Sequence, residues 1–215
     1  MAAGPNPASV RDLAHGGGRA CRSGNIVVVT VLVDEAVWPW RGARWAHLVS
    51  DESVAELHAF AERLGLRRMA FQGDHYDVPA DVRERALALG AEAVRGRDLV
   101  RRLRTAGLRL GRGERPGRWA EVWRGVPNGA RPEPGAAVPE SLATALTEVE
   151  ADWESAEVVA YRRSFGGVGE AIVVVEDAVG VSAPDPFPAG DGYVQAWRHD
   201  DRRVELLVRT PAVLQ

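Results

Sequence analysis

The chain has 215 residues, and 46% of them are hydrophobic, so it is long and apolar enough for one large domain or two small ones. Its net charge of −3 argues against a protein whose whole surface follows a phosphate backbone. The single cysteine, Cys21, excludes an intrachain disulfide, and no apolar run approaches the ~20 residues that span a bilayer. We therefore expect a cytoplasmic protein with no membrane segment.

All 27 basic residues are arginine, and Ala, Gly, Pro and Val are abundant. This composition is typical of a GC-rich bacterial genome, in which codon bias raises the arginine count. An arginine-rich stretch is therefore weaker evidence for phosphate binding here than in a chain that also uses lysine.

Residues 1–24 are rich in Gly, Ala, Pro and Arg and show no hydrophobic periodicity. We interpret them as a disordered leader that precedes the true start of the protein, which we place at a valine start codon near Val29. A transit peptide is the alternative, because the leader has several arginines and one acid, Asp12.

The regular elements begin with Ile26–Val33, a β-branched run that is typical of a strand buried on both faces of a sheet. A helix follows, which we expect Ser50 or Asp51 to cap and Gly65 to end. Its inward positions at helical spacing are Val54, Leu57, Ala61 and Leu64. Arg68–Gln72 is predicted to be the next short strand.

The same pattern of amphipathic helix, glycine and short apolar segment occurs twice more. Pro79 opens a second helix that Gly90 ends, and Ala91–Val94 is the strand after it. A third helix ends at Gly107 before the apolar segment Leu108–Leu110. The inward positions of these two helices are Val82, Ala86, Leu89, Leu99, Leu103 and Ala106. This alternation predicts an α/β domain over residues 25–110, with a parallel or mostly parallel sheet and flanking helices.

The remainder of the chain is predicted to be a linker followed by a smaller α+β carboxy-terminal unit. Residues 111–138 are dense in Gly, Pro and Arg, although the spacing of Trp119 and Trp123 indicates one helical face that docks onto a domain. Residues 139–215 form the α+β unit, with an extension of the first sheet as the alternative. Its expected elements are a helix over Pro139–Trp153, with Leu142, Leu146 and Val149 inward, and strands at Val158–Tyr161, Ala171–Val175, Tyr193–Trp197 and Val204–Val208, the last two as a hairpin.

Polar side chains follow the first two predicted strands, at the edge where open parallel sheets bind ligands. We expect Asp34 to face the run Asp74-His75-Tyr76-Asp77 across one crevice. The candidate metal ligands are Asp34, Asp74 and Asp77, and such carboxylates favour magnesium or manganese. The candidate catalytic residues are His75, Asp77 and His47, with His75 as a general base.

Local structure offers an alternative role for each of these groups. Asp77 could cap the helix that begins near Pro79, and Asp74 could form a turn with Gly73. Asp34 could close a loop through a hydrogen bond, and His47, which precedes two apolar residues, could simply be packed.

Residues 38–45 combine aromatic faces with guanidinium groups, which can stack a base and clamp a phosphate. The candidate ligand-binding residues are Trp38, Trp40, Arg41, Arg44, Trp45 and, from the acidic run, Tyr76. The alternative is a small apolar core that anchors a long loop, since we expect so much apolar surface not to be left exposed.

The sequence has no phosphate loop with lysine, no dinucleotide glycine fingerprint, no nucleophile elbow and no paired-cysteine zinc site. A basic stripe could contact nucleic acid, but a solvated helix face explains it more simply in a chain without lysine. The stripe comprises Arg95, Arg97, Arg101, Arg102, Arg104 and Arg109. His58 falls on the apolar face of its helix and is predicted to lie beside the core rather than to be catalytic.

Several short motifs occur together in the order and spacing of one bacterial and phage family. They are Val31-Leu32-Val33-Asp34, Trp45-Ala46-His47-Leu48, Glu56-Leu57-His58, Phe71-Gln72, His75-Tyr76-Asp77 and Gly90-Ala91. On these motifs the chain resembles the family called domain of unknown function 4031, over roughly Val29 to Leu110. The resemblance implies that Asp34, His47, His58 and residues 75–77 match recurrent positions of the family, and it transfers no activity.

These observations lead us to expect a site for a phosphorylated or nucleotide-like small molecule, with Arg41 and Arg44 at its anionic group. A divalent ion in such a site would make hydrolysis of a phosphate ester the preferred reaction. The alternative is a non-catalytic module that binds nucleic acid or a protein partner through residues 38–45.

Overall fold

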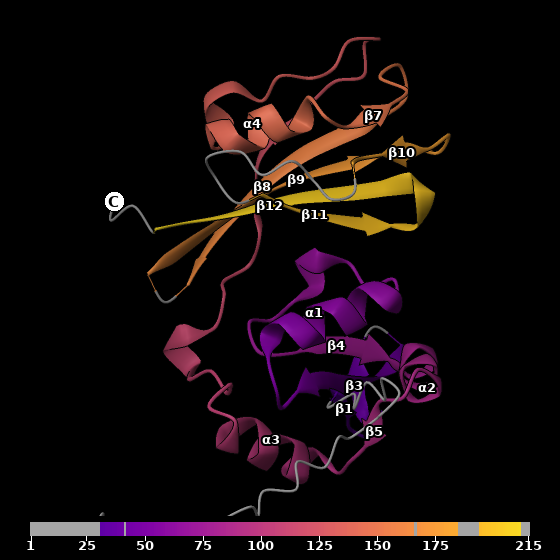
Figure 1. The fold of residues 1–215 in the computed structure, drawn as a ribbon, viewed down its shortest axis with the longest axis vertical. Coiled ribbons are helices and arrows are strands. Elements are labelled where there is room, and N and C mark those ends of the chain that lie inside the picture. The colour runs from indigo at the N-terminus through magenta and orange to yellow at the C-terminus, as the bar shows by residue number, and fades with distance from the viewer. Residues whose placement is uncertain (1–30, 41, 166, 185–193, 212–215) are drawn as a thin grey trace, which may run out of the picture.

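The computed structural model describes residues 31–40, 42–165, 167–184 and 194–211 (Figure 1). They form two lobes, and each lobe is built on a five-stranded sheet of its own. The expected leader, Cys21, the first residues of the strand expected at 26–33 and Arg41 lie outside the described residues. In the part of the chain that is described, no helix combines the length and the apolar surface needed to cross a membrane.

The sheet of the N-terminal lobe is centred on the long strand β3. Its strands are β1 (Val31–Val33), β2 (Trp38–Trp40), β3 (Ala43–Ser50), β4 (Tyr76–Pro79) and β5 (Glu92–Ala93). On one edge of β3, its first residues pair with β2 and its last residues pair with β1. On the other edge, β3 pairs with β4. The remaining strand, β5, pairs with β1.

The expectation of a mostly parallel sheet is wrong. Only the pair of β1 with β5 is parallel among the described strands, and the other pairs in this sheet are antiparallel. The reason lies in residues 38–50, which were expected to form a loop and instead form the hairpin of β2 and β3. A positive φ of 77° at Gly42 permits the tight turn, and a hairpin can join antiparallel strands only.

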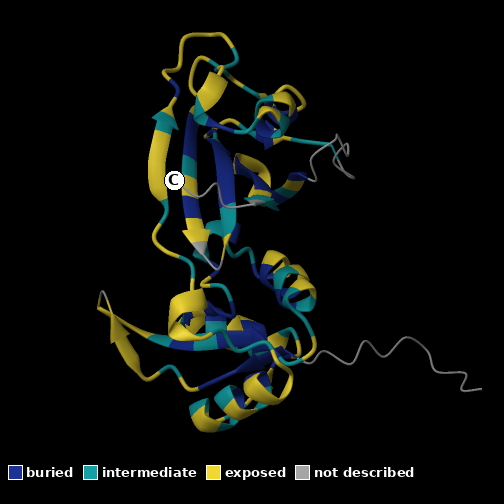
Figure 2. Ribbon diagram, turned by 90° about the vertical axis from the view of Figure 1, so that its left-hand side faces the viewer, coloured by how far each residue is buried: buried dark blue, intermediate teal, exposed yellow. Residues whose placement is uncertain are grey.

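Helices cover both faces of this sheet. The helices α1 (Val54–Arg63) and α2 (Ala80–Ala88) pack on one face, and α3 (Gly96–Thr105) packs on the other. These three helices were predicted, although the α1 cap is Ser53, whose hydroxyl accepts the N–H of Glu56, rather than Ser50 or Asp51. Burial of their apolar stripes on both faces stabilises this otherwise small sheet (Figure 2).

Two local predictions in and after this lobe are wrong. Residues 68–72, predicted as a strand, form the 3-10 turn Arg68–Ala70 and one isolated bridge from Phe71 to Tyr76. The helical face expected for Trp119 and Trp123 is absent, because Ala120–Arg124 pairs with a neighbouring strand as β6.

The C-terminal lobe is an antiparallel sheet with one helix on its outer face. Its strands follow the order β11, β12, β9, β8 and β6, so they form a separate sheet and do not extend the first one. Their bounds are β6 (Ala120–Arg124), β8 (Glu157–Phe165), β9 (Val168–Glu176), β11 (Val194–His199) and β12 (Arg203–Pro211), and β7 (Glu150–Ala151) pairs with β10 (Val181–Ser182). The helix α4 (Glu140–Leu146) is shorter than predicted, but its residues Leu142 and Leu146 are buried as expected, and so is Val149, which follows the helix.

The two lobes contact each other through the segment after α1, which lies beside the C-terminal sheet (Figure 1). Indole N–H groups of Trp197 and Trp119 donate to backbone oxygens of Leu66 and Met69 at 2.8 and 3.0 Å. Trp119 therefore docks onto the N-terminal lobe, as expected. It does so from a position just before strand β6 and not from a helix. Trp197 is buried in the hydrophobic cluster of the N-terminal lobe, so the lobes share part of one core.

His58 lies beside the core at this contact, as predicted. Its ring packs against Phe71 and Trp197 at centroid distances of 4.5 and 5.8 Å, and its Nδ1 is 3.0 Å from the hydroxyl of Tyr76. Burial, followed by the positive charge of Arg68, lowers the pKa of His58 from 6.5 to about 3. The folded protein therefore holds this imidazole neutral across most of the acidic range.

This lowered pKa predicts a pH-dependent loss of stability. The unfolded chain takes up a proton at His58 below pH 6.5, and the folded chain does so only near pH 3. The stability that neutral His58 contributes is therefore complete above pH 6.5 and is lost as pH falls toward 3. Between pH 7 and 4.5, wild type should lose on the order of 2 kcal/mol more unfolding free energy than His58→Leu. Urea titrations at both pH values measure this difference, and parallel losses in the two proteins would contradict it.

Candidate functional site

The antiparallel pairing brings the predicted site residues onto one face of the N-terminal sheet. Side chains alternate along β3 and β4, so Leu48 and Tyr76 enter the core while His47 and Asp77 point to the face that α3 covers. In the register of these strands, His47 lies directly across from Asp77. Asp34, which follows β1, donates its backbone N–H to the backbone oxygen of His47 at 3.2 Å and so joins the same face.

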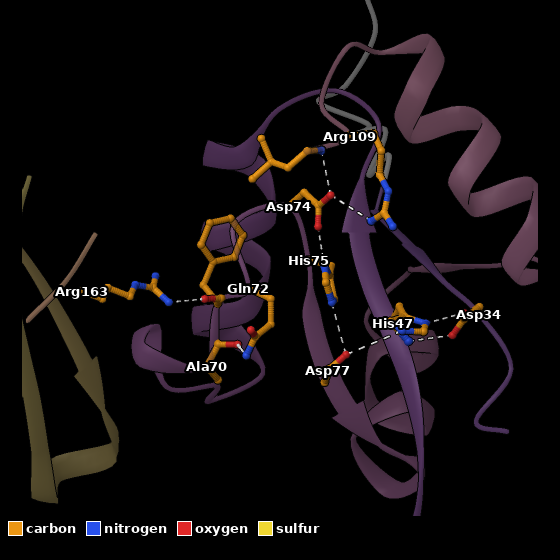
Figure 3. Close-up of polar contacts among 11 residues, drawn as sticks. Asp34, His47, Ala70, Gln72, Asp74, His75, Asp77, Arg109 and Arg163 are labelled. Carbon is orange, nitrogen blue, oxygen red and sulfur yellow. Dashed lines mark hydrogen bonds and ion pairs between the residues drawn. The ribbon is translucent and has the colours of Figure 1, made fainter. Parts of the chain in front are cut away.

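A chain of carboxylates and imidazoles crosses this face (Figure 3). Asp34 accepts the backbone N–H of His47 at 2.7 Å, and its other oxygen lies 2.8 Å from Nδ1 of that ring. Asp74 lies 2.5 Å from Nδ1 of His75. Asp77 stands between the two rings, with Oδ1 at 3.8 Å from Nε2 of His47 and 3.5 Å from Nε2 of His75. Both turns expected to carry the site therefore meet at one place.

The outer carboxylates determine which ring nitrogens are available. An ionised carboxylate only accepts hydrogen bonds, so Asp34 and Asp74 hold the Nδ1 atoms of their neighbours in the protonated form. In each ring Nε2 is then the nitrogen that faces Asp77. One ligand atom from each of His47, His75 and Asp77 lies within 4.8 Å of the other two. These three side chains can converge on one cation, with Asp34 and Asp74 orienting the rings.

The same contacts shift the pKa values of the cluster. Burial lowers the pKa of His75, but the hydrogen bonds and charges of Asp74 and Asp77 outweigh burial and raise it. Burial raises the pKa of each of these aspartates, but the hydrogen bond and charge of His75, helped by Leu110 and Arg109 at Asp74 and by the charge of Arg115 at Asp77, outweigh it, so both pKa values are lowered. Without a cation the three groups form an ion-paired cluster, and a cation at Nε2 of His75 displaces its proton.

Asp74 also ties the site to the segment that follows α3. Its second oxygen accepts the guanidinium N–H of Arg109 at 2.9 Å and the backbone N–H of Leu110 at 3.0 Å. Gly73, just before it, has a positive φ of 94°, which glycine adopts readily. Both oxygens of Asp74 are therefore occupied by protein partners, which suits an orienting residue better than a metal ligand.

The imidazoles open into a cavity of about 620 Å³ between the sheet and α3. One part of its wall is apolar and consists of Val49, Leu99, Val100 and the ring of Trp38. The other part is basic and consists of Arg97, Arg104, Arg109 and Arg115. The cavity therefore offers guanidinium groups for an anionic ligand beside two imidazoles that can hold a cation.

The comparison with protein families covers this part of the chain. Residues 31–106 match the model of the family described as "Protein of unknown function (DUF4031)". This match confirms the resemblance seen in the motifs, and the matched residues, called the DUF4031 segment below, contain the imidazoles and the three aspartates of the cluster. Searches among curated proteins and among solved structures gave no match.

Several expected ligand-binding residues of the DUF4031 segment lie away from the cavity. Tyr76 is fully buried, and its hydroxyl contacts His58 instead. Trp40 and Trp45 stack edge to face on the hairpin at 5.0 Å, and neither they nor Arg44 line the cavity. Among the described residues of this group only Trp38 lines it, and its ring lies 5.9 Å from that of His47.

The hairpin is also more exposed than the sequence suggested. We expected so much apolar surface not to be left exposed, yet Trp38 is 57% exposed and Trp40 is 53% exposed. The hairpin projects from the sheet in Figure 2, where its end is coloured as exposed. An aromatic strand pair that lacks a helix above it has no apolar surface to pack against.

The basic wall of the cavity was underestimated from the sequence. Arg97, Arg104 and Arg109 belonged to a stripe attributed to a solvated helix face, and Arg115 was assigned to a linker. The sequence contained one signal for this wall. Arg97 and Arg104 are seven residues apart in α3, so they lie on the same side of the helix, next to the apolar residues Leu99 and Val100. Their proximity to the imidazoles depends on how α3 packs on the sheet, which no local pattern specifies.

Proposed function

We propose that the DUF4031 segment binds a divalent cation through His47, His75 and Asp77 and hydrolyses a phosphate ester of a phosphorylated or nucleotide-like molecule. One observation carries the proposal. Two imidazoles that line an arginine-lined cavity are each held at Nδ1 by a carboxylate and direct Nε2 toward a third carboxylate, Asp77.

The ligand chemistry favours zinc over magnesium. Magnesium prefers oxygen ligands in octahedral geometry, whereas two imidazoles and one carboxylate are a typical set for zinc and its neighbours in the first transition series. Catalytic zinc sites commonly use three protein ligands and leave the fourth position to water. The acidic residues had suggested magnesium or manganese, but Asp34 and Asp74 serve here as partners of the imidazoles.

The charge of the cavity favours a phosphorylated substrate. Arg97, Arg104 and Arg115 form no ion pair with the described residues, so their charges are available to a ligand. Guanidinium groups bind phosphate oxygens with two parallel hydrogen bonds, and several of them can neutralise a phosphate dianion. Arg109 faces the same cavity but shares its charge with Asp74, so it contributes less.

The proposed reaction needs only water as a co-reactant. A bound divalent cation acts as a Lewis acid on the phosphoryl oxygen and lowers the pKa of water at the site. The water oxygen forms a bond to phosphorus, the ester P–O bond breaks, and the alcohol leaves with a proton that the water gives up. In this scheme His75 acts through Nε2 as a metal ligand, and it replaces the general base expected from the sequence.

A metal-replacement assay tests the proposal. Full-length protein is stripped with a chelator, reloaded with zinc, manganese or magnesium, and assayed with p-nitrophenyl phosphate and bis(p-nitrophenyl) phosphate. We expect zinc or manganese to raise the rate at least about tenfold, and Asp77→Asn to return it to background. Asp81→Asn, an exposed carboxylate at the start of α2, is the matched control and should keep the wild-type rate. Equal rates with and without every metal would refute the proposal.

The exposed hairpin supports a second candidate function, a non-catalytic module that binds nucleic acid or a protein partner. Trp38 and Trp40 present large aromatic surfaces that nothing in the described residues covers fully. If the hairpin alone is the binding surface, Trp38→Ala and Trp40→Ala should weaken equally the binding of the nucleic acid or protein partner. If the cavity is the binding site, only Trp38→Ala should do so, because Trp40 does not line it.

A further inference from the structure

A second basic cavity adjoins the one that contains the imidazoles. It measures about 630 Å³ and is lined by Arg104, Arg109, Arg112 and Arg115 together with Gly107, Leu110 and Gly111. Three of these arginines, Arg104, Arg109 and Arg115, also line the first cavity. The two cavities therefore meet at a shared row of arginines, called the basic path below, with the imidazoles lining only the first cavity and Arg112 only the second.

The charge of this second cavity is largely uncompensated. Arg104, Arg112 and Arg115 form no ion pair with the described residues. The acid beside them, Glu114, is held by the backbone N–H of Gly111 at 2.7 Å. Since four guanidinium groups exceed what one phosphate at the imidazoles needs, the path suits a ligand with more than one phosphate.

An aromatic ring stands at the imidazole end of this path. Trp38 lines the first cavity, is more than half exposed, and lies edge to face with His47 at 5.9 Å. An exposed indole face beside a row of cations is the combination that proteins use for single-stranded nucleic acid, in which bases stack on aromatic rings and the backbone follows the positive charge. Bases within a duplex are already stacked on one another and would not offer a face to this ring.

We propose that the two cavities together bind a single strand of nucleic acid, with a base stacked on Trp38 and consecutive phosphates along Arg104, Arg115 and Arg112. This assignment rests on the proposed function, because it places one phosphodiester of the strand at His47, His75 and Asp77. There the water oxygen bonds to phosphorus and one ester P–O bond breaks. The products are one strand that ends in a phosphate and one that ends in a hydroxyl, and no other reactant is needed.

A binding experiment without metal tests the assignment separately from hydrolysis. Full-length protein with EDTA is titrated into fluorescently labelled eight-nucleotide strands of DNA and of RNA, and the anisotropy is measured at several salt concentrations. A hairpin duplex of the same length and a mononucleotide serve as comparators. We expect the single strands to bind at least about tenfold more tightly than either comparator. The DNA and RNA arms show which sugar the path accepts.

Variants then connect the binding to these residues. Trp38→Ala should weaken single-strand binding about tenfold, through loss of one stacked base. Arg112→Ala should lower the slope of log Kd against log salt by about 0.7, through loss of one phosphate contact on a single strand. Arg101→Ala is the matched control, because Arg101 is exposed on α3, pairs with Asp98 at 3.1 Å and lines neither cavity. It should leave affinity and slope unchanged.

The outcomes separate this assignment from the proposed hydrolysis. If small esters are hydrolysed with metal but single strands bind no better than the mononucleotide, the single-strand assignment is overturned and the hydrolysis stands. If single strands bind and respond to Trp38→Ala and Arg112→Ala while no ester is hydrolysed, the assignment stands and the hydrolysis fails. Equal effects of Arg101→Ala and Arg112→Ala on affinity and salt slope would show that the strand is held only by general charge attraction. This result would overturn the assignment.

Discussion

Replacing His75 with alanine should remove zinc binding and, with it, hydrolysis of phosphate esters. The variant loses one of three proposed ligands, so we expect zinc affinity to fall on the order of 1000-fold and activity to reach background. Competition with a chromogenic chelator measures the affinity. Since His75 is largely buried, His47→Ala, at a more exposed ring, provides a second ligand variant that is less able to disturb folding.

Two comparisons make this prediction specific. His199→Ala removes a histidine of β11 that lies outside the cluster, and it should leave zinc affinity unchanged. Asp34→Asn keeps the shape of the side chain but weakens its hold on Nδ1 of His47, so it should reduce zinc affinity by about 10-fold to 100-fold. Zinc affinity that is the same in His75→Ala, His47→Ala and wild type would show that the cluster is structural.

Replacing Glu170 with alanine should give the largest loss of stability outside the site. Its fully buried carboxylate accepts hydrogen bonds from Arg163 at 2.7 Å and Arg209 at 2.9 Å, and it lies 3.8 Å from Arg68. Without it, the buried guanidinium group of Arg68 loses the carboxylate it pairs with, and that of Arg163 loses one of its partners. Leaving a buried charge unpaired costs about 3–5 kcal/mol, which lowers the melting temperature by roughly 10 °C in a chain of this size.

Urea unfolding followed by tryptophan fluorescence measures this loss. Glu157→Ala is the matched control, because that glutamate lies on β8 of the same sheet but pairs with Arg124 at the exposed edge. Exposed ion pairs contribute little, so the control should unfold at nearly the wild-type urea concentration. A similar midpoint for Glu170→Ala would mean that the buried arginines find other partners. Because Arg163 also donates to the backbone of Phe71, the loss should affect the contact between the lobes.

Local sequence patterns were sufficient for the helices of the N-terminal lobe and for the strands of the C-terminal hairpin. The spacing of Leu57 and Ala61 in α1, or of Leu99 and Leu103 in α3, reports directly which side of a helix is buried. The predicted hairpin of β11 and β12 is also present, since two apolar segments flank the polar turn at Asp200. These features depend on residues close together in the chain.

The direction of the strands in the first sheet could not be obtained in this way. An apolar run such as Val31–Val33 has the same pattern in a parallel and in an antiparallel sheet. Its partner was decided by the turn at Gly42, which returns the chain alongside it as β3. Because residues 38–50 were interpreted as a loop of aromatic and basic residues, the strand that carries His47 was missed.

The amino-acid sequence by itself determined the family of residues 31–106 and the chemistry available there, namely the imidazoles and carboxylates of the two turns. Only the tertiary structure decided their roles. Pairing of β3 with β4 sets His47 opposite Asp77, and packing of α3 brings its arginines to the same cavity. The physical reason is that a side chain's chemistry is local, whereas register and helix packing are contacts between residues far apart in the chain, which local periodicity does not encode.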